Sequence, residues 1–123
     1  MSKQLIFLEG GQGLSDSDEE DFISLSKKFN CMLFDNLYEE PLKIIALKYL
    51  KPEFLHISTT GMYQEKLKTL IDYFEIAEHI PEGVIFSSER TAMVLLGLAR
   101  ELKEKGTHFY YCYDGKLQEI SWI

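Results

Sequence analysis

Short apolar runs alternate with stretches of helical spacing along most of this chain, and this alternation constrains its fold more than any other feature. The runs at 5–8, 31–34 and 84–86 are continuously apolar, and the run at 54–57 is apolar except for His56, as strands buried on both faces are. Strands that are separated by helices pair in parallel, and the helices pack on the faces of the sheet. We therefore expect an α/β fold with a mostly parallel sheet between two layers of helices.

Helix signals lie between these runs. Ser17 and Glu20 have the spacing of a capping box, which predicts a helix that begins at Ser17 and ends near Phe29. Pro41 suits the first turn of a second helix, and Pro52 ends it. The apolar spacing predicts the helix faces Leu42, Ile45, Ala46 and Tyr49, then Leu67, Leu70, Ile71 and Phe74, then Met93, Leu96, Ala99 and Leu102.

The chain ends on a hairpin signal. Asp114-Gly115 lies between two strand patterns, 109–113 and 117–123, and this dipeptide favours a two-residue turn. We expect the two strands to add a C-terminal antiparallel hairpin to the sheet.

Length and charge limit the possible functions. The chain has 123 residues and fits one domain, 1–123. Its formal charge of −7 argues against a nucleic-acid duplex as partner, because duplex binding needs many cations against phosphates. No apolar stretch approaches the roughly 18–20 residues that span a bilayer, and no signal peptide is evident, so we expect a cytoplasmic protein without a membrane partner. Cys31 and Cys112 have no metal-ligand spacing and are expected to be buried, reduced thiols.

Three turns follow predicted strands at the edge where ligands of parallel sheets bind. They are the loop of Gly10, Gly11, Gln12 and Gly13, the turn after 54–57 with Thr59 and Thr60, and the turn from Ser87 to Thr91. The first loop lacks the lysine of a phosphate-binding loop and the third glycine of a dinucleotide fingerprint.

The third turn combines the hydroxyls of Ser87, Ser88 and Thr91 with the guanidinium of Arg90. Helix N-termini offer free N–H groups and a positive dipole to anions, so this turn is a candidate anion site. The alternative is that the hydroxyls only cap the helix.

The acidic run 16–21 and the three histidines are given structural interpretations. Acidic side chains are favoured in the first turn of a helix, so a solvated helix start is preferred to a metal site, and no metal is expected. His56, His79 and His108 lie far apart in the sequence and pair with no evident nucleophile.

Two segments carry a family resemblance, Pro52-Glu-Phe-Leu-His-Ile-Ser-Thr-Thr60 and the stretch from Val84 through Met93 to the hairpin ending in Lys116. Together they resemble the CARF domain family, the Rossmann-like sensor module of type III CRISPR defence. Aligned on Met93, the family's two glycines are Ser88 and Glu89 here. The family's lysine is Thr91, and Arg90 stands one place earlier.

The resemblance implies a stand-alone Rossmann-like homodimer that binds a cyclic oligoadenylate across its two-fold axis, in antiviral defence. The ligand would be lined by Gly10 to Gly13, Thr59, Thr60 and the turn from Ser87 to Thr91. Some members of the family cleave the ring, and a stand-alone module fits three roles: a ring nuclease that needs neither metal nor cofactor, a ligand sponge, or a small sensor subunit that acts through a protein partner. In a ring nuclease of this kind the following roles are implied. Arg90 would stabilise the developing charge, and Ser87 and Ser88 would form hydrogen bonds with the reacting phosphate.

Two other hypotheses about the function remain open. One is a non-enzymatic domain that docks a protein partner through its acidic surface, which predicts an exposed apolar patch near Tyr110, Tyr113 and Trp122. The other is a flavodoxin-like binder of a small molecule.

Overall fold

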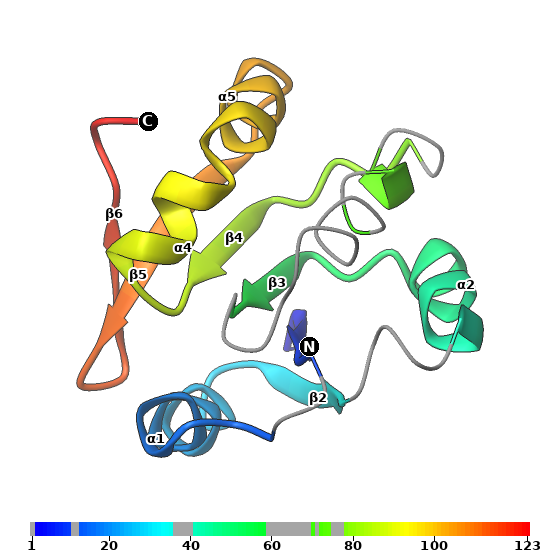
Figure 1. The fold of residues 1–123 in the computed structure, drawn as a ribbon. Helices are drawn as coiled ribbons and strands as arrows, with labels where there is room; N and C mark the ends of the chain where they lie inside the picture. The colour runs from blue at the N-terminus through cyan, green and yellow to red at the C-terminus, as the bar shows by residue number, and fades with distance from the viewer. Residues whose placement is uncertain (1, 11–12, 36–40, 59–69, 71, 75–77) are drawn as a thin grey trace.

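The computed structural model describes residues 2–10, 13–35, 41–58, 70, 72–74 and 78–123. Six strands of this part form one sheet in the order β2-β1-β3-β4-β5-β6 (Figure 1). They are β1 (Gln4–Leu8), β2 (Asn30–Phe34), β3 (Phe54–Ile57), β4 (Gly83–Phe86), β5 (His108–Tyr113) and β6 (Lys116–Glu119). The first five pair in parallel and β6 is antiparallel to β5. The expected α/β fold with a C-terminal hairpin is therefore confirmed.

The hairpin turn has the conformation that its sequence favours. Asp114 and Gly115 both have positive φ, 49° and 75°, which matches the right-handed twist of the flanking strands.

The N-cap of the first helix lies two residues earlier than its sequence suggested, at Ser15 rather than Ser17. α1 spans Asp16–Leu25, and the hydroxyl of Ser15 accepts the N–H of Asp18 at 3.1 Å. Ser15 has extended backbone and satisfies a first-turn donor, so the capping role predicted for Ser17 was wrong. Residues 26–28 form turns, and the helix ends before Phe29.

The second helix, α2 (Pro41–Leu50), is rotated relative to our expectation. Leu47 is fully buried, whereas Leu42, Ile45 and Tyr49 are 77%, 50% and 79% exposed. Both faces of this helix carry apolar residues, so spacing alone did not reveal which one meets the sheet. Leu67 and Ile71 of the predicted third helix face lie outside the described residues, whereas residues 70 and 72–74 are helical.

The predicted last helix is two helices, α4 (Glu89–Val94) and α5 (Leu96–Glu104), which meet at Leu95. The break shifts the buried stripe to Ala92, Leu95, Leu98, Ala99 and Leu102. Met93, expected in the core, is 56% exposed, and Leu96 is only partly buried. Gly106 ends α5 at a φ of 107°, where its N–H donates to Lys103 and the N–H of Thr107 donates to Leu102.

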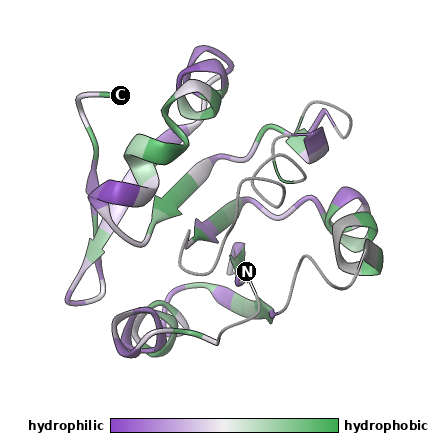
Figure 2. Cartoon of the chain, viewed as in Figure 1, coloured by the Kyte–Doolittle hydropathy of each residue, from purple (hydrophilic) through white to green (hydrophobic). Residues whose placement is uncertain are grey.

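Alternate strand positions supply two hydrophobic clusters. Leu5 and Phe7 pack with Leu25 of α1, whereas Ile6 and Leu8 share a cluster with residues of α2, α4 and α5. β4 appears in the hydrophobic colour in Figure 2, and Val84, Ile85 and Phe86 are indeed buried. Among the described residues, no helix is long and apolar enough to cross a membrane. Cys31 and Cys112 are free thiols that are partly rather than fully buried.

Candidate functional site

The strand order reverses between β1 and β3. From β1 the chain moves to β2 on one side, and β3 then pairs on the other side. At such a reversal the connections leave the carboxyl ends of the strands in opposite directions, and ligands of open α/β sheets bind in the opening.

The loop after β1 follows this reversal of the strand order, and a buried carboxylate bridges its two described ends. Glu9 is 4% exposed, and its Oε1 accepts the N–H of Gly13 at 2.9 Å. Gly13 has a φ of 84°, a conformation that glycine adopts without strain. Gly10 is buried, and Gly11 and Gln12 lie outside the described residues.

The turns after β3 and β4 are neighbours. The N–H of Ser87 donates to the carbonyl of Ile57 at 3.0 Å, so the third turn starts beside the end of β3. Ser58 is 5% exposed, while Thr59 and Thr60 lie outside the described residues.

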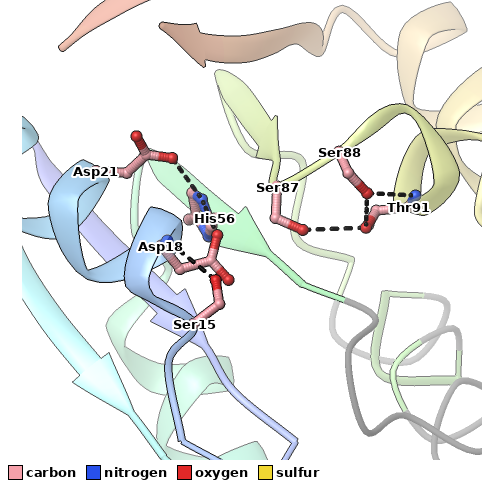
Figure 3. Close-up of polar contacts among 7 residues, drawn as sticks. All are labelled: Ser15, Asp18, Asp21, His56, Ser87, Ser88 and Thr91. Carbon is pink, nitrogen blue, oxygen red and sulfur yellow. Dashed lines mark hydrogen bonds and ion pairs between the residues drawn. The ribbon is translucent and has the colours of Figure 1, made fainter. Parts of the chain in front are cut away.

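The hydroxyls of the third turn bind one another (Figure 3). The Oγ1 of Thr91 lies 3.1 Å from the Oγ of Ser87 and 3.2 Å from the Oγ of Ser88. Ser88 is also the N-cap of α4 and accepts the N–H of Thr91. Helix capping, the alternative that the sequence left open, is therefore observed for Ser88. Thr91 is 1% exposed and holds the two serines in place.

The charged residues of this turn lie on the surface. Ser88, Glu89 and Arg90 are exposed, and Ser87 is half-buried. Burial raises the pKa of Tyr111 on β5, and the Glu89 carboxylate raises it further. Glu89 therefore lies close enough to Tyr111 to disfavour its ionised form.

Sequence reasoning missed a cluster of His56 with two carboxylates of α1. The Nε2 of His56 lies 3.7 Å from the Oδ1 of Asp18 and 3.8 Å from the Oδ2 of Asp21 (Figure 3). Asp18 is 3% exposed, so a solvated position is wrong for this residue. Its spacing from Phe22 and Leu25 was the available signal, because residues at i, i+4 and i+7 share one helix face.

Neither ring nitrogen of His56 has a hydrogen-bond partner in the described structure. The ring is 1% exposed and stacks on Phe7 at 4.0 Å between centroids. Leaving a buried polar group unsatisfied costs about 1–3 kcal/mol, so this ring needs an explanation.

The other two histidines match the structural role expected of them. His79 lies 2.8 Å from the hydroxyl of Tyr73 through Nδ1 and 2.9 Å from the carbonyl of Pro52 through Nε2. His108 lies 2.6 Å from a carboxylate oxygen of Glu119. His56 is the exception among the three.

Two surface pockets lie at opposite edges of the sheet. One of about 250 Å³ is lined by Asp21, Ser24, Asp114 and Gly115, between α1 and the hairpin turn. The other, of about 470 Å³, is lined by Gly106, His108 and Phe109 among others, at the amino end of β5. The smaller pocket borders the hairpin turn that follows the carboxyl end of β5, which is the edge where ligands of parallel sheets bind.

Comparison with known proteins identifies no relative. No protein-family model, curated protein or solved structure matches the chain.

Proposed function

We propose that this chain is a Rossmann-like three-layer domain that binds a cyclic oligoadenylate as a homodimer. The observation that carries the proposal is the position of the Ser87–Thr91 turn. It directly follows a parallel strand and is hydrogen-bonded to the end of β3, next to the point where the strand order reverses.

The chemistry of the turn suits a phosphate. Ser88 and Arg90 are exposed on the first turn of α4, where hydroxyl and guanidinium donors can reach an anion. Thr91 is the positioning residue in this proposal, because its buried hydroxyl orients Ser87 and Ser88. Gly10 to Gly13, Thr59 and Thr60 complete the proposed ligand surface.

Ring cleavage is the second part of the proposal. A ribose 2′-hydroxyl would be held in line with the neighbouring phosphate, and the protein would supply position and charge. Arg90 would stabilise the charge that develops on the phosphate, with Ser87 and Ser88 as hydrogen-bonding partners.

Thermal shift tests the binding step. Cyclic tetra- and hexa-adenylate are compared with flavin mononucleotide, which suits the flavodoxin-like alternative. A ligand at 100 times its Kd adds about 2.7 kcal/mol to the free energy of unfolding, so a rise in Tm of about 10 °C is expected. Stabilisation by flavin alone, or by none of the three, contradicts the proposal.

Product analysis tests the cleavage step. Arg90→Ala should bind weakly and release no linear product. Arg100→Ala is the matched control, because Arg100 is an exposed arginine on α5. Full cleavage by Arg90→Ala removes this residue from the mechanism.

A second candidate is the protein-interaction domain, and the exposed stripe Leu42, Ile45 and Tyr49 on α2 favours it. The hairpin patch expected for this function is present in part. Tyr113 and Trp122 are 59% and 43% exposed, whereas Tyr110 is partly buried and packs against Phe54. If a partner binds the stripe, Leu42→Lys/Tyr49→Lys should abolish its capture from the native host without changing nucleotide binding.

A further inference from the structure

We propose that Asp18, Asp21 and His56 form a binding site for one divalent transition-metal ion of the Zn²⁺ class. The site joins α1 to the centre of the sheet. It is independent of the proposed nucleotide function, which uses neither a metal nor these residues.

The spacing of the three side chains fits a shared ion. One nitrogen and two carboxylate oxygens, one from each residue, all lie within 4.8 Å of one another. The separations of 3.7 and 3.8 Å from the His56 Nε2 exceed hydrogen-bond length. Two ligands about 2.1 Å from a tetrahedral ion lie about 3.4 Å apart, so a small movement would bring these atoms to metal distances.

The buried imidazole is an independent sign of a ligand. His56 is 1% exposed and stacks on Phe7, and within the described part of the chain both of its ring nitrogens lack hydrogen bonds. Its ring lies beside the two carboxylates (Figure 3). A protonated ring would balance their charge, but at these distances it donates no hydrogen bond to either. A cation satisfies the Nε2 and both carboxylates together.

Groups around the cluster orient it and leave it accessible. The thiol of Cys112 donates a hydrogen bond to Asp21, and such hydrogen bonds hold metal-ligating carboxylates in a fixed orientation. Asp21 also lines the pocket of about 250 Å³ beside the hairpin turn, which provides a route from solvent.

The donor set determines the class of ion. Imidazole with two carboxylates suits Zn²⁺ or Mn²⁺, whereas Mg²⁺ and Ca²⁺ prefer oxygen ligands alone. Three protein ligands leave a fourth position for water or another small ligand.

Isothermal titration of the full chain, stripped with a chelator, tests the site with Zn²⁺ as the probe. We expect one ion per chain and no displacement by excess Mg²⁺. Asp18→Asn/Asp21→Asn should weaken Zn²⁺ binding by about 100-fold or more, as expected when ligands themselves are lost. Asp16→Asn is the matched control, because it removes an exposed charge from the same helix turn and should bind like the wild type.

A second variant separates the loss of a metal ligand from the loss of the fold. His56→Phe keeps the ring stacked on Phe7, and circular dichroism of the metal-free variants verifies their fold. His56→Phe should also lose Zn²⁺ binding. When Co²⁺ is added in place of Zn²⁺, the wild type alone should show the absorption spectrum of Co²⁺ bound by nitrogen and oxygen ligands. The proposal is overturned if the wild type binds no Zn²⁺, if a folded variant binds as tightly as the wild type, or if a thiolate-to-cobalt band shows that cysteine holds the ion.

Discussion

Gly83→Ala tests the packing between the two central strands. Gly83 and Phe54 are register partners on β4 and β3. A Cβ at position 83 would lie 2.2 Å from the Cε1 and 2.6 Å from the Cδ1 of Phe54. The ring has little room to move, since it is 6% exposed and lies 4.9 Å from the Phe29 ring and 6.3 Å from the Tyr110 ring between centroids.

The magnitude follows from these distances. Non-bonded carbon atoms prefer about 3.5–4.0 Å, so the ring must move by about 1 Å or more. Overpacking of this kind costs about 1–3 kcal/mol. Alanine in a strand gains about 0.5–1 kcal/mol over glycine through lower chain entropy. We therefore expect Gly83→Ala to lower the free energy of unfolding by about 1–2 kcal/mol.

Urea denaturation measures this change, and a double-mutant cycle assigns its cause. In a Phe54→Leu background the same substitution should cost almost nothing, because the ring that it strikes is gone. Gly97→Ala is the control, since Gly97 is exposed on α5 with no atom within 4 Å of a new Cβ. It should raise stability by about 0.5–1 kcal/mol. An unchanged free energy of unfolding for Gly83→Ala, or an equal loss in both backgrounds, would show that a clash with the Phe54 ring is not the cause.

Three further predictions concern single side chains. Thr91→Val should lower the free energy of unfolding by about 1–2 kcal/mol in urea, because both serines lose a buried partner; no loss would contradict the role of Thr91 in the turn. Burial lowers the pKa of His79 below 6.5, so the stability it confers is complete above about pH 6.5 and is lost as the pH falls below it. The decrease in unfolding free energy between about pH 7.5 and 5.5 should be smaller in His79→Gln, and an equal decrease would exclude His79 as its source. Burial, with help from Asp21, raises the pKa of Cys112 to about 11, so iodoacetamide at about pH 8 should alkylate this thiol far more slowly in the folded than in the urea-unfolded chain; equal rates would contradict this.

The strands and the hairpin could be predicted because their signals are local. A run such as 54–57 is apolar at almost every position, and Asp114-Gly115 specifies its own turn. Features that depend on tertiary contacts could not be predicted from the sequence. The face that α2 turns to the sheet and the break at Leu95 depend on neighbouring elements, and apolar spacing does not encode them.

Of the candidate functional residues, those in a local sequence pattern were predicted and those brought together by folding were not. The Ser87–Thr91 turn was found because hydroxyls between a strand and a helix form a local pattern. The cluster of Asp18, Asp21 and His56 was not found, because its members come from two segments that meet only in the folded chain. A histidine inside an apolar strand has no partner in the sequence, and its position beside α1 gives it significance.

Calorimetry with cyclic tetra- and hexa-adenylate tests the proposed function most directly. We expect saturable binding of at least one of them, at one ring per two chains, and weaker binding by Arg90→Ala than by Arg100→Ala. Absence of binding heat with both rings, or a ratio of one ring per chain, would contradict a homodimer that holds its ligand between two Ser87–Thr91 turns.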